Sequence, residues 1–138
     1  MINPPVSVLL VESDAVDAKR IREVLAGVGR PVFHVESAGL CADALLRLQK
    51  GAVDVVLLDL MLPDARGLEV FERVRQAAPD ALILVLSAAS DEATARTAVQ
   101  HGADDYLVKG HVDAHWLPRA LDYLLGRKAA RDALRRSE

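Results

Sequence analysis

The sequence predicts an α/β fold, in which a doubly wound parallel sheet of five strands is covered by helices on both faces as a three-layer sandwich. Five short apolar runs recur along the 138 residues. Most of these runs are continuous rather than alternating, which is typical of strands covered on both faces. Segments with helical spacing lie between the runs, so strands and helices alternate along the chain with short connections.

The five predicted strands are the apolar runs at residues 6–11, 32–36, 53–58, 82–86 and 106–108. Hydrophobic residues make up 51% of the chain, whereas aromatic residues make up only 4%. We therefore expect an aliphatic core of Ala, Val, Leu and Ile side chains. The chain has the usual length of one domain and can bury such a core without disulfides.

The predicted helices lie between and after these strands. In chain order they are residues 15–28, a segment around Cys41, residues 67–77, residues 91–101 and a long segment from about residue 113 to the C terminus. Cys41 is expected to be a small buried hydrophobe rather than a reactive thiol. Glycines end three of the helices, at Gly27, Gly51 and Gly102. Gly126 interrupts the pattern of the last segment.

The composition narrows the classes of function and location. The net charge is −3, so no overall charge attracts the protein to nucleic acid or to an anionic membrane. The single cysteine excludes an intrachain disulfide and fits a reducing compartment. The first residues lack the basic region of a signal peptide, and no stretch approaches the roughly 18 apolar residues of a membrane span. We therefore expect a cytoplasmic protein with no direct nucleic-acid or membrane partner.

Polar residues follow four of the predicted strands, at the point where each strand ends. They are Glu12, Ser13 and Asp14 after the first strand, Asp59 and Asp64 after the third, Ser87 and Ala88 after the fourth, and Lys109 after the fifth. In a doubly wound sheet, ligands bind beyond the carboxyl ends of the strands, where the strand order reverses. The convergence of these residues on one sheet edge therefore predicts a functional site there.

Acidic side chains that are held close together need a cation. Two carboxylates repel by roughly 4 kcal/mol at 4 Å and an effective dielectric near 20, so Lys109 or a divalent ion must offset them. An oxygen-only site with few carboxylates suits Mg²⁺. A carboxylate beside Mg²⁺ and a lysine can attack a phosphoryl group and form an aspartyl phosphate, while both cations neutralise the transferring oxygens.

Four segments resemble the receiver domains of response regulators. They are VLLVES at the first strand, VDVVLLDLMLPDARGLEV around Asp59, LILVLSA at the fourth strand and GADDYLVKG at the fifth. The resemblance covers about residues 5–125 and implies a flavodoxin-like (βα)5 fold. It also implies two-component signal transduction, in which a sensor histidine kinase or a histidine phosphotransfer protein supplies the phosphoryl group. Such a domain is not an enzyme, because at most it catalyses its own phosphorylation and dephosphorylation.

The resemblance implies roles for individual residues. Asp59 matches the phosphoacceptor, Lys109 matches the lysine that pairs with the phosphoryl group, and Ala88 matches the small residue that leaves the phosphate room. Ser87 matches the switch hydroxyl that turns toward the phosphate. Tyr106 matches the aromatic residue that rotates as Ser87 moves, so that the surface of the fourth helix, fifth strand and fifth helix repacks.

The resemblance also implies a magnesium site with one weak position. Glu12, Asp59 and the backbone carbonyl of Met61 match the ligands. Most receivers carry a second acid directly after the first, whereas Ser13 stands there in this chain. A neutral hydroxyl is a weaker ligand, so we expect weakened Mg²⁺ binding. Asp14 either helps through a water molecule or is only the N-cap of the first helix, and we favour the cap.

A second departure lies after the lysine, where Gly110 replaces the proline of many receivers. With the long helix that follows, this form resembles receivers attached to sensor kinases or cyclic-dinucleotide enzymes. We assign residues 1–125 to the receiver domain and residues 126–138 to a helical extension or linker toward a domain absent from this chain. The arginines at 127, 131 and 135 favour a solvated basic face, and a helix leading into another domain or helical partner is the alternative.

Two other functions compete with the phosphorylated switch. A pseudo-receiver would dimerise or dock without phosphorylation. Ser13 favours this alternative, and the retention of Asp59, Ser87 and Lys109 disfavours it. A small flavin or nucleotide binder would need a glycine-rich phosphate loop after the first strand, where the sequence is VESDAVD instead.

Two further interactions are weaker expectations. His111 and His115 have a zinc-like spacing, but no cysteine or acid is placed to complete a zinc site. A homodimer would use the surface of the fourth helix, fifth strand and fifth helix, although charged faces are usually just solvated. The charged residues of that surface are Asp104, Asp105, Arg119 and Asp122.

Overall fold

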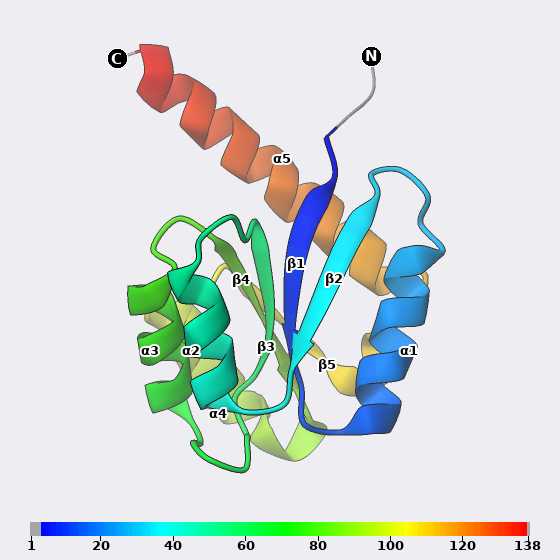
Figure 1. The fold of residues 1–138 in the computed structure, drawn as a ribbon, viewed down its shortest axis with the longest axis vertical. Helices are drawn as coiled ribbons and strands as arrows, with labels where there is room; N and C mark the ends of the chain where they lie inside the picture. The colour runs from blue at the N-terminus through cyan, green and yellow to red at the C-terminus, as the bar shows by residue number, and fades with distance from the viewer. Residues whose placement is uncertain (1–3, 138) are drawn as a thin grey trace.

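The computed structural model describes residues 4–137 and contains one sheet of five strands (Figure 1). In chain order, the strands and helices are β1 (Val6–Val11), α1 (Ala15–Ala26), β2 (Phe33–Ala38), α2 (Cys41–Gln49), β3 (Val55–Asp59), α3 (Leu68–Ala77), β4 (Leu82–Ser87), α4 (Glu92–Gln100), β5 (Asp105–Val108) and α5 (Trp116–Ser137). Short 3₁₀ turns at Ala89–Asp91 and Lys109–His111 precede α4 and α5. All strand pairs are parallel, in the order β2-β1-β3-β4-β5. The predicted doubly wound fold is confirmed.

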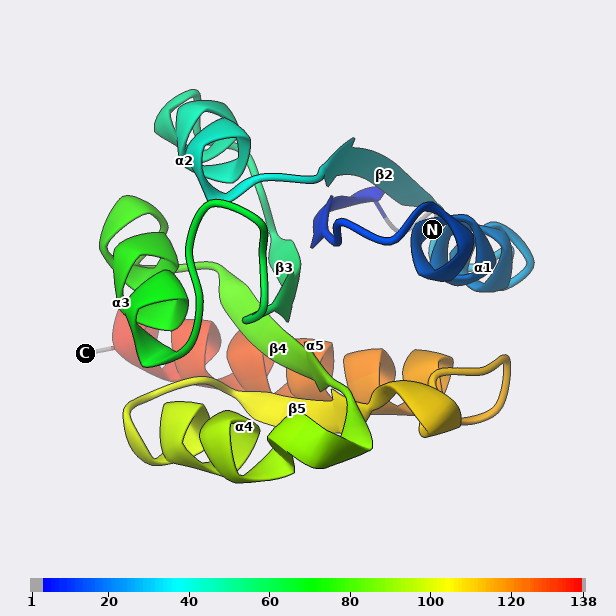
Figure 2. The same ribbon diagram turned by 90° about the horizontal axis from the view of Figure 1, so that it is seen from below.

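The helices form two layers, with α1 and α5 on one face of the sheet and α2, α3 and α4 on the other (Figures 1 and 2). Alternate residues of the central strands serve each layer. In β3, for example, Val56 and Leu58 pack toward α2 and α3, whereas Val55 and Leu57 pack toward α1 and α5. All five residues of β3 are buried, which explains why its sequence is a continuous apolar run. Phe71 is the one fully buried aromatic side chain among residues 4–137, as the aliphatic composition predicts.

The predicted bounds differ most at β2 and at the start of the last helix. β2 pairs with β1 from Phe33 to Ala38 and runs two residues further than its apolar run. It is an edge strand with alternating burial, so its polar end does not look like a strand in the sequence. α5 begins at Trp116 rather than near residue 113, because Asp113 Oδ1 accepts hydrogen bonds from the N–H groups of His115 and Trp116 and so caps the helix.

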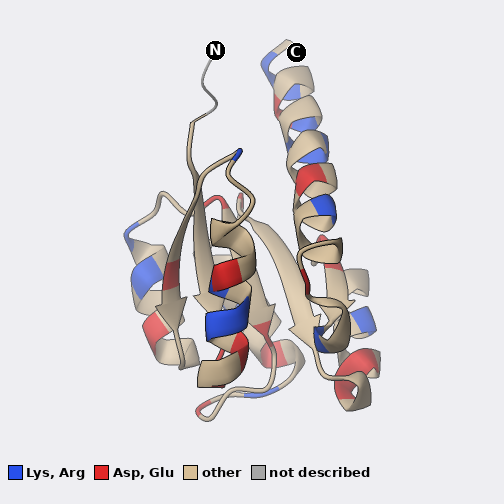
Figure 3. Ribbon diagram, turned by 90° about the vertical axis from the view of Figure 1, so that its right-hand side faces the viewer, with Lys and Arg blue, Asp and Glu red and all other residues tan. Residues whose placement is uncertain are grey.

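α5 is a single helix of 22 residues. Leu117, Leu121 and Leu124 bury its first half against the sheet, and its second half projects beyond the sheet (Figures 1 and 3). The interruption of the pattern at Gly126 does not end the helix. The projecting half carries most of the basic residues of α5 (Figure 3). Within the described residues, no helix is both long enough and apolar enough to cross a membrane.

Asp104, which belongs to the surface predicted for a homodimer, serves the fold instead. Its Oδ2 accepts a hydrogen bond of 2.7 Å from the Ile83 N–H and another of 3.2 Å from Arg75. Arg75 also donates to the carbonyl of Ala81 at 2.7 Å. Asp104 and Arg75 therefore fasten the start of β4 to α3.

Candidate functional site

The pairing of the strands brings the predicted site residues to one edge of the sheet. Val11, the last residue of β1, pairs with Leu58, so Glu12 and Asp59 leave adjacent strands side by side. Ser87 pairs with Val108, so Lys109 follows directly at the same edge. The strand order reverses between β1 and β3, which is where ligands of doubly wound sheets bind.

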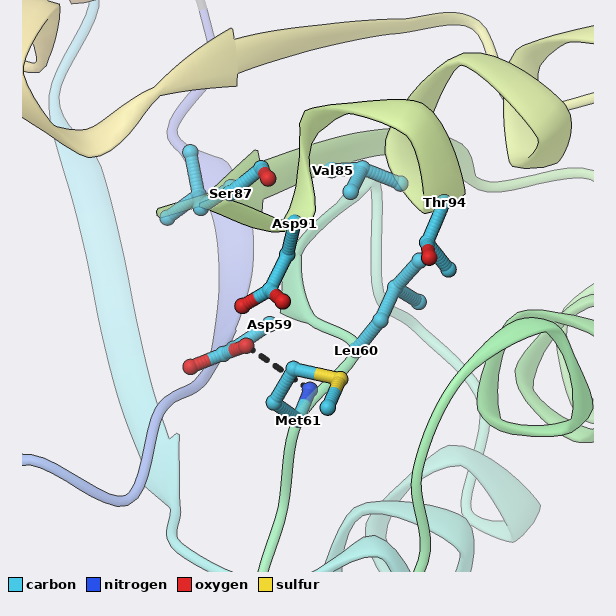
Figure 4. Close-up of a pocket in the computed structure, with 8 residues that line it drawn as sticks. Asp59, Leu60, Met61, Val85, Ser87, Asp91 and Thr94 are labelled. Carbon is cyan, nitrogen blue, oxygen red and sulfur yellow. Dashed lines mark hydrogen bonds between the residues drawn. The ribbon is translucent and has the colours of Figure 1, made fainter. Parts of the chain in front are cut away.

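Asp59 is buried, with 6% of its surface exposed, and both of its oxygens have partners. Oδ1 accepts a hydrogen bond of 2.8 Å from the Met61 N–H (Figure 4). Oδ2 accepts a hydrogen bond of 2.8 Å from Lys109 Nζ. These two contacts fix the orientation of the carboxylate, and Asp59 lines a small pocket.

Glu12 is also buried, and its two oxygens point to different partners. Oε2 accepts a hydrogen bond of 3.2 Å from the Asp14 N–H, and Oε1 lies 2.6 Å from Lys109 Nζ. Burial raises the pKa of Glu12; Lys109 and the Asp14 N–H partly oppose this rise, and the nearby charge of Asp59 adds to it. The two acids are therefore close enough to repel, as the sequence predicts.

Lys109 offsets both acids. It begins the 3₁₀ turn that follows β5, and its ammonium lies between the carboxylates of Glu12 and Asp59. Burial alone would lower the pKa of Lys109, but the hydrogen bonds and charges of Asp59 and Glu12 outweigh burial and raise its pKa overall. Lys109 therefore stays charged at physiological pH.

Asp14 caps α1 and does not point into the site. Its Oδ1 accepts hydrogen bonds of 2.9 Å from the N–H groups of Val16 and Asp17, so the preferred interpretation of Asp14 as an N-cap is confirmed. Ser13 is exposed. No acid therefore occupies the second position of the acidic pair, and Glu12 and Asp59 are the buried carboxylates at this sheet edge.

Replacing the cap should destabilise α1. Asp14→Ala is expected to lower the free energy of unfolding by about 1 kcal/mol, because two N–H groups of the first turn lose their acceptor. Urea unfolding of the two proteins measures the difference. Glu72→Ala, at an exposed position in the middle of α3, is the matched control and should change the free energy by less than about 0.5 kcal/mol. Equal losses in both variants would contradict the capping role.

Asp64, which the sequence places at the same sheet edge, lies away from the acidic pair. Its two oxygens accept hydrogen bonds from the N–H groups of Cys41 and Ala42, at 2.8 and 2.9 Å. These hydrogen bonds, that of Ala42 first, lower the pKa of Asp64. Leu40 provides no side-chain cap for α2, so Asp64 caps that helix from the loop after β3. Cys41 is buried, as expected.

The two residues predicted to switch do not contact each other through hydrogen bonds in this structure. Ser87 Oγ donates to the carbonyl of Ala88 at 2.7 Å. Tyr106 is half-buried against the core, and its hydroxyl donates to Glu92 Oε2 at 2.7 Å. Glu92 begins α4 and also lies 3.2 Å from Arg96. The Tyr106 hydroxyl is thus tied to α4, while the Ser87 hydroxyl stays on its own strand end.

Two further acids face the site, and the sequence reasoning missed both. Asp17 Oδ2 lies 3.6 Å from Lys109 Nζ. Asp91 lines the pocket that Asp59 and Ser87 also line, and its carboxylate points into that pocket (Figure 4). Asp17 lies one helical turn after the cap Asp14, so the helical spacing places it at the same end of α1. Asp91 is the last residue of a 3₁₀ turn that the sequence does not indicate.

The side-chain oxygens at this site fit a Mg²⁺ ion that takes only a few ligands from the protein. Among residues 4–137, no three His, Cys, Asp or Glu side chains form a group that could hold a metal ion. Glu12 Oε1 is the one buried side-chain oxygen of the described chain without a hydrogen bond of good geometry, although Lys109 Nζ is near it. Two buried carboxylates suit an ion that keeps several of its waters. His111 and His115 are exposed and do not belong to any such group.

Comparison with known proteins places this site in a wider context. Residues 8–120 match the family model described as the response regulator receiver domain. The chain is 38% identical over 105 residues to the KDP operon transcriptional regulatory protein KdpE of Escherichia coli K12, covering 75% of this chain and 44% of that protein. It is 35% identical over 126 residues to the response regulator MprA of Mycobacterium sp. strain KMS, covering 91% and 50%. The chain thus spans about half the length of these relatives.

Solved structures agree with the fold. The signal receiver domain of an HD domain-containing protein from Pseudomonas fluorescens Pf-5 has a TM-score of 0.83 at 24% identity and covers 96% of each chain. NtrX from Brucella abortus has a TM-score of 0.87 at 19% identity and covers 98% of this chain and 30% of that one. At these identities the likeness concerns the arrangement of the backbone.

Proposed function

Because the chain belongs to the response regulator receiver domain family, we propose that Asp59 is its phosphoacceptor. One observation carries the proposal: at the carboxyl edge of the sheet, a buried Asp59 carboxylate is held 2.8 Å from a charged lysine. Receiver domains are signalling domains of two-component response regulators rather than classical enzymes. They receive the phosphoryl group from histidine kinases or phosphotransfer proteins.

In the proposed reaction, a carboxylate oxygen of Asp59 attacks the phosphorus of a phosphohistidine on the donor protein. The new P–O bond replaces the P–N bond, and the imidazole leaves with the electron pair and takes a proton from solvent. Lys109 lies where it can offset the negative charge of the transferring oxygens. Its two acidic neighbours keep it charged, and Ala88 leaves room beside the phosphoryl group.

Receiver domains generally bind Mg²⁺ at acidic residues for phosphorylation. In this chain, Glu12, Asp59 and the backbone carbonyl of Met61 would hold the ion, and the neutral hydroxyl of Ser13 stands where a further acid is usual. When bound, Mg²⁺ neutralises charge on the phosphoryl oxygens. With Asp14 committed to capping α1, we infer a weakened magnesium site.

The proposed response links Ser87 to Tyr106. A phosphoryl group on Asp59 adds about 1.5 to 2 negative charges and offers new acceptors to the Ser87 hydroxyl, which would leave the Ala88 carbonyl. Tyr106 lies on the neighbouring strand, β5, and its hydroxyl donates a hydrogen bond to Glu92 of α4. Its rotation would release that bond and repack the surface of α4, β5 and α5. At most, the domain catalyses its own phosphorylation and dephosphorylation.

The location and the assembly of the protein are also proposals. The single cysteine favours the cytoplasm, and the net charge favours no direct binding of nucleic acid or membrane. The partner would be a sensor histidine kinase or a phosphotransfer protein. Residues 1–125 would form the receiver, and residues 126–138 would lead toward a further domain. A homodimer would use the surface of α4, β5 and α5.

The full chain, Mg²⁺ and a small phosphodonor or beryllofluoride test the proposal. Trp116, which is half exposed at the start of α5, should change its fluorescence in a saturable manner, and the intact mass should rise by one phosphoryl group with the phosphodonor. An unchanged mass and fluorescence at millimolar Mg²⁺ would contradict the proposal and favour a module that docks or dimerises without phosphorylation.

A further inference from the structure

The side chain of Arg20 crosses from α1 to the turn that carries Lys109. Nη1 donates a hydrogen bond of 2.8 Å to the carbonyl of Val112. Nη1 and Nη2 also lie 3.4 and 3.3 Å from the carbonyl of Lys109 itself. One guanidinium therefore binds the first residue of the 3₁₀ turn and the residue that follows it, which matches the fixed fork of an arginine better than a lysine ammonium.

This turn has few other restraints. β5 ends at Val108, and the next anchor is Val112, whose side chain is fully buried. Between them, Gly110 has no side chain, and no heavy atom lies within 4 Å of the place where a Cβ would be. Glycine leaves more backbone freedom than any other residue. The Lys109 carbonyl accepts a hydrogen bond of 3.2 Å from the Val112 N–H within the turn, and the hydrogen bonds from Arg20 add to it.

Asp17 connects the arginine to the ammonium. Its Oδ1 lies 3.3 Å from Arg20 Nη2, and its Oδ2 lies 3.6 Å from Lys109 Nζ. The Asp17 N–H is held in turn by the cap Asp14. Arg20 therefore contacts the backbone of Lys109 directly and reaches its side chain through Asp17, so both ends of the lysine are tied to α1.

We propose that Arg20 is a positioning residue for phosphoryl transfer, which fixes the Lys109 turn from α1 and, with Asp17, places the Lys109 ammonium between Glu12 and Asp59. This inference rests on the proposed function of Asp59. Arg20 does not touch the reacting atoms, since its contacts are two carbonyls and one carboxylate. In a turn that contains glycine, it adds side-chain hydrogen bonds from α1 to the backbone hydrogen bond that the Val112 N–H makes to the Lys109 carbonyl.

Arg20→Ala tests the proposal, with Arg22→Ala as the matched control. Arg22 lies on the same helix and donates one side-chain hydrogen bond, to Ser37 Oγ at 2.8 Å, but it makes no hydrogen bond to the turn. In the presence of Mg²⁺, Arg20→Ala should weaken the binding of beryllofluoride by about fivefold, because charge-assisted hydrogen bonds to the turn are lost. Mg²⁺ affinity without the anion should change by less than about twofold, since the ligands themselves are intact.

The second readout is the ¹⁵N resonance of the Lys109 ammonium in the metal-free protein. It should broaden or shift in Arg20→Ala and stay unchanged in Arg22→Ala, because only the first substitution frees the turn. This signal does not require phosphorylation. If the wild-type chain failed to bind beryllofluoride, the proposed function would be contradicted, while the Lys109 resonance would still decide the role of Arg20.

Wild-type beryllofluoride affinity and an unchanged Lys109 resonance in Arg20→Ala would overturn the inference. Arg20→Lys is the second variant, and it serves as the test if the alanine variant folds poorly. Lysine keeps the positive charge of the arginine. One ammonium cannot reproduce the fork across both carbonyls, so an intermediate loss of affinity is expected. Full wild-type behaviour of Arg20→Lys would show that a positive charge alone suffices. It would also overturn the inference that Arg20 fixes the Lys109 turn through its two carbonyl contacts.

Discussion

Asp59→Asn is expected to abolish phosphorylation and any fluorescence response to a phosphodonor. A neutral amide is not a nucleophile toward phosphorus at neutral pH. Among the described residues, Asp59 is the one carboxylate that accepts hydrogen bonds from both the Met61 N–H and Lys109 Nζ. The fold should persist, because the amide oxygen can still accept the hydrogen bond from the Met61 N–H and Glu12 still neutralises Lys109. Intact-mass measurement after incubation with the phosphodonor gives the result directly.

The matched control is Asp54→Asn. Asp54 precedes the same strand, β3, but lies at the opposite edge of the sheet, where its Oδ2 accepts a hydrogen bond of 2.8 Å from the Ser7 N–H. Asparagine keeps an acceptor there, so phosphorylation should proceed at the wild-type level. Continued phosphorylation of Asp59→Asn at one site would mean that another residue is the acceptor.

Ser13→Asp is expected to tighten Mg²⁺ binding by about tenfold or more. A new carboxylate beside the ion would attract it, and repulsion of that carboxylate from Glu12 and Asp59 would offset part of this attraction. A tenfold gain in affinity corresponds to a net change of about 1.4 kcal/mol in the free energy of Mg²⁺ binding. Titration with Mg²⁺, followed by calorimetry or by NMR shifts, measures the change.

Ser13→Asn separates charge from shape, because asparagine has the size of aspartate without its charge. It should leave the Mg²⁺ affinity within about twofold of the wild type. Without metal, Ser13→Asp should also be less stable than Ser13→Asn, because a third acid then crowds the site. If both variants bound Mg²⁺ as the wild type does, Ser13 would not be the cause of a weak site.

The sequence predicts the central strands well because they are buried on both faces. Nearly every position in them is therefore apolar, and the strand appears as a continuous apolar run. The edge strand β2 is predicted less well, since its exposed face needs no apolar residues and its last residues read as a loop. Asp59 and Ser87 are the last residues of β3 and β4, and Glu12 and Lys109 directly follow β1 and β5. The register of a parallel sheet then brings them together, so the candidate site could be predicted from strand ends alone.

Contacts that depend on loops and on side-chain direction escape sequence reasoning. Because Asp64 follows the third predicted strand, the sequence places it at the same sheet edge as Asp59. The loop after β3 instead turns the Asp64 carboxylate toward the N terminus of α2. The dihedral path of a loop sets this direction, and no periodicity describes it. Arg20 and Asp17 were missed for a similar reason, because the helix pattern identifies which face is buried but not which turn a long polar side chain reaches across.

The continuous course of α5 has a mechanical consequence. Its first turn follows directly from the loop that holds Lys109, and its 22 residues form a rod of about 33 Å. The first half of this rod is held against the sheet by Leu117, Leu121 and Leu124, so only the projecting half, about 18 Å long, is free to change direction. A change of about 10° in the direction of that half would move its far end by about 3 Å, roughly half of one helical pitch.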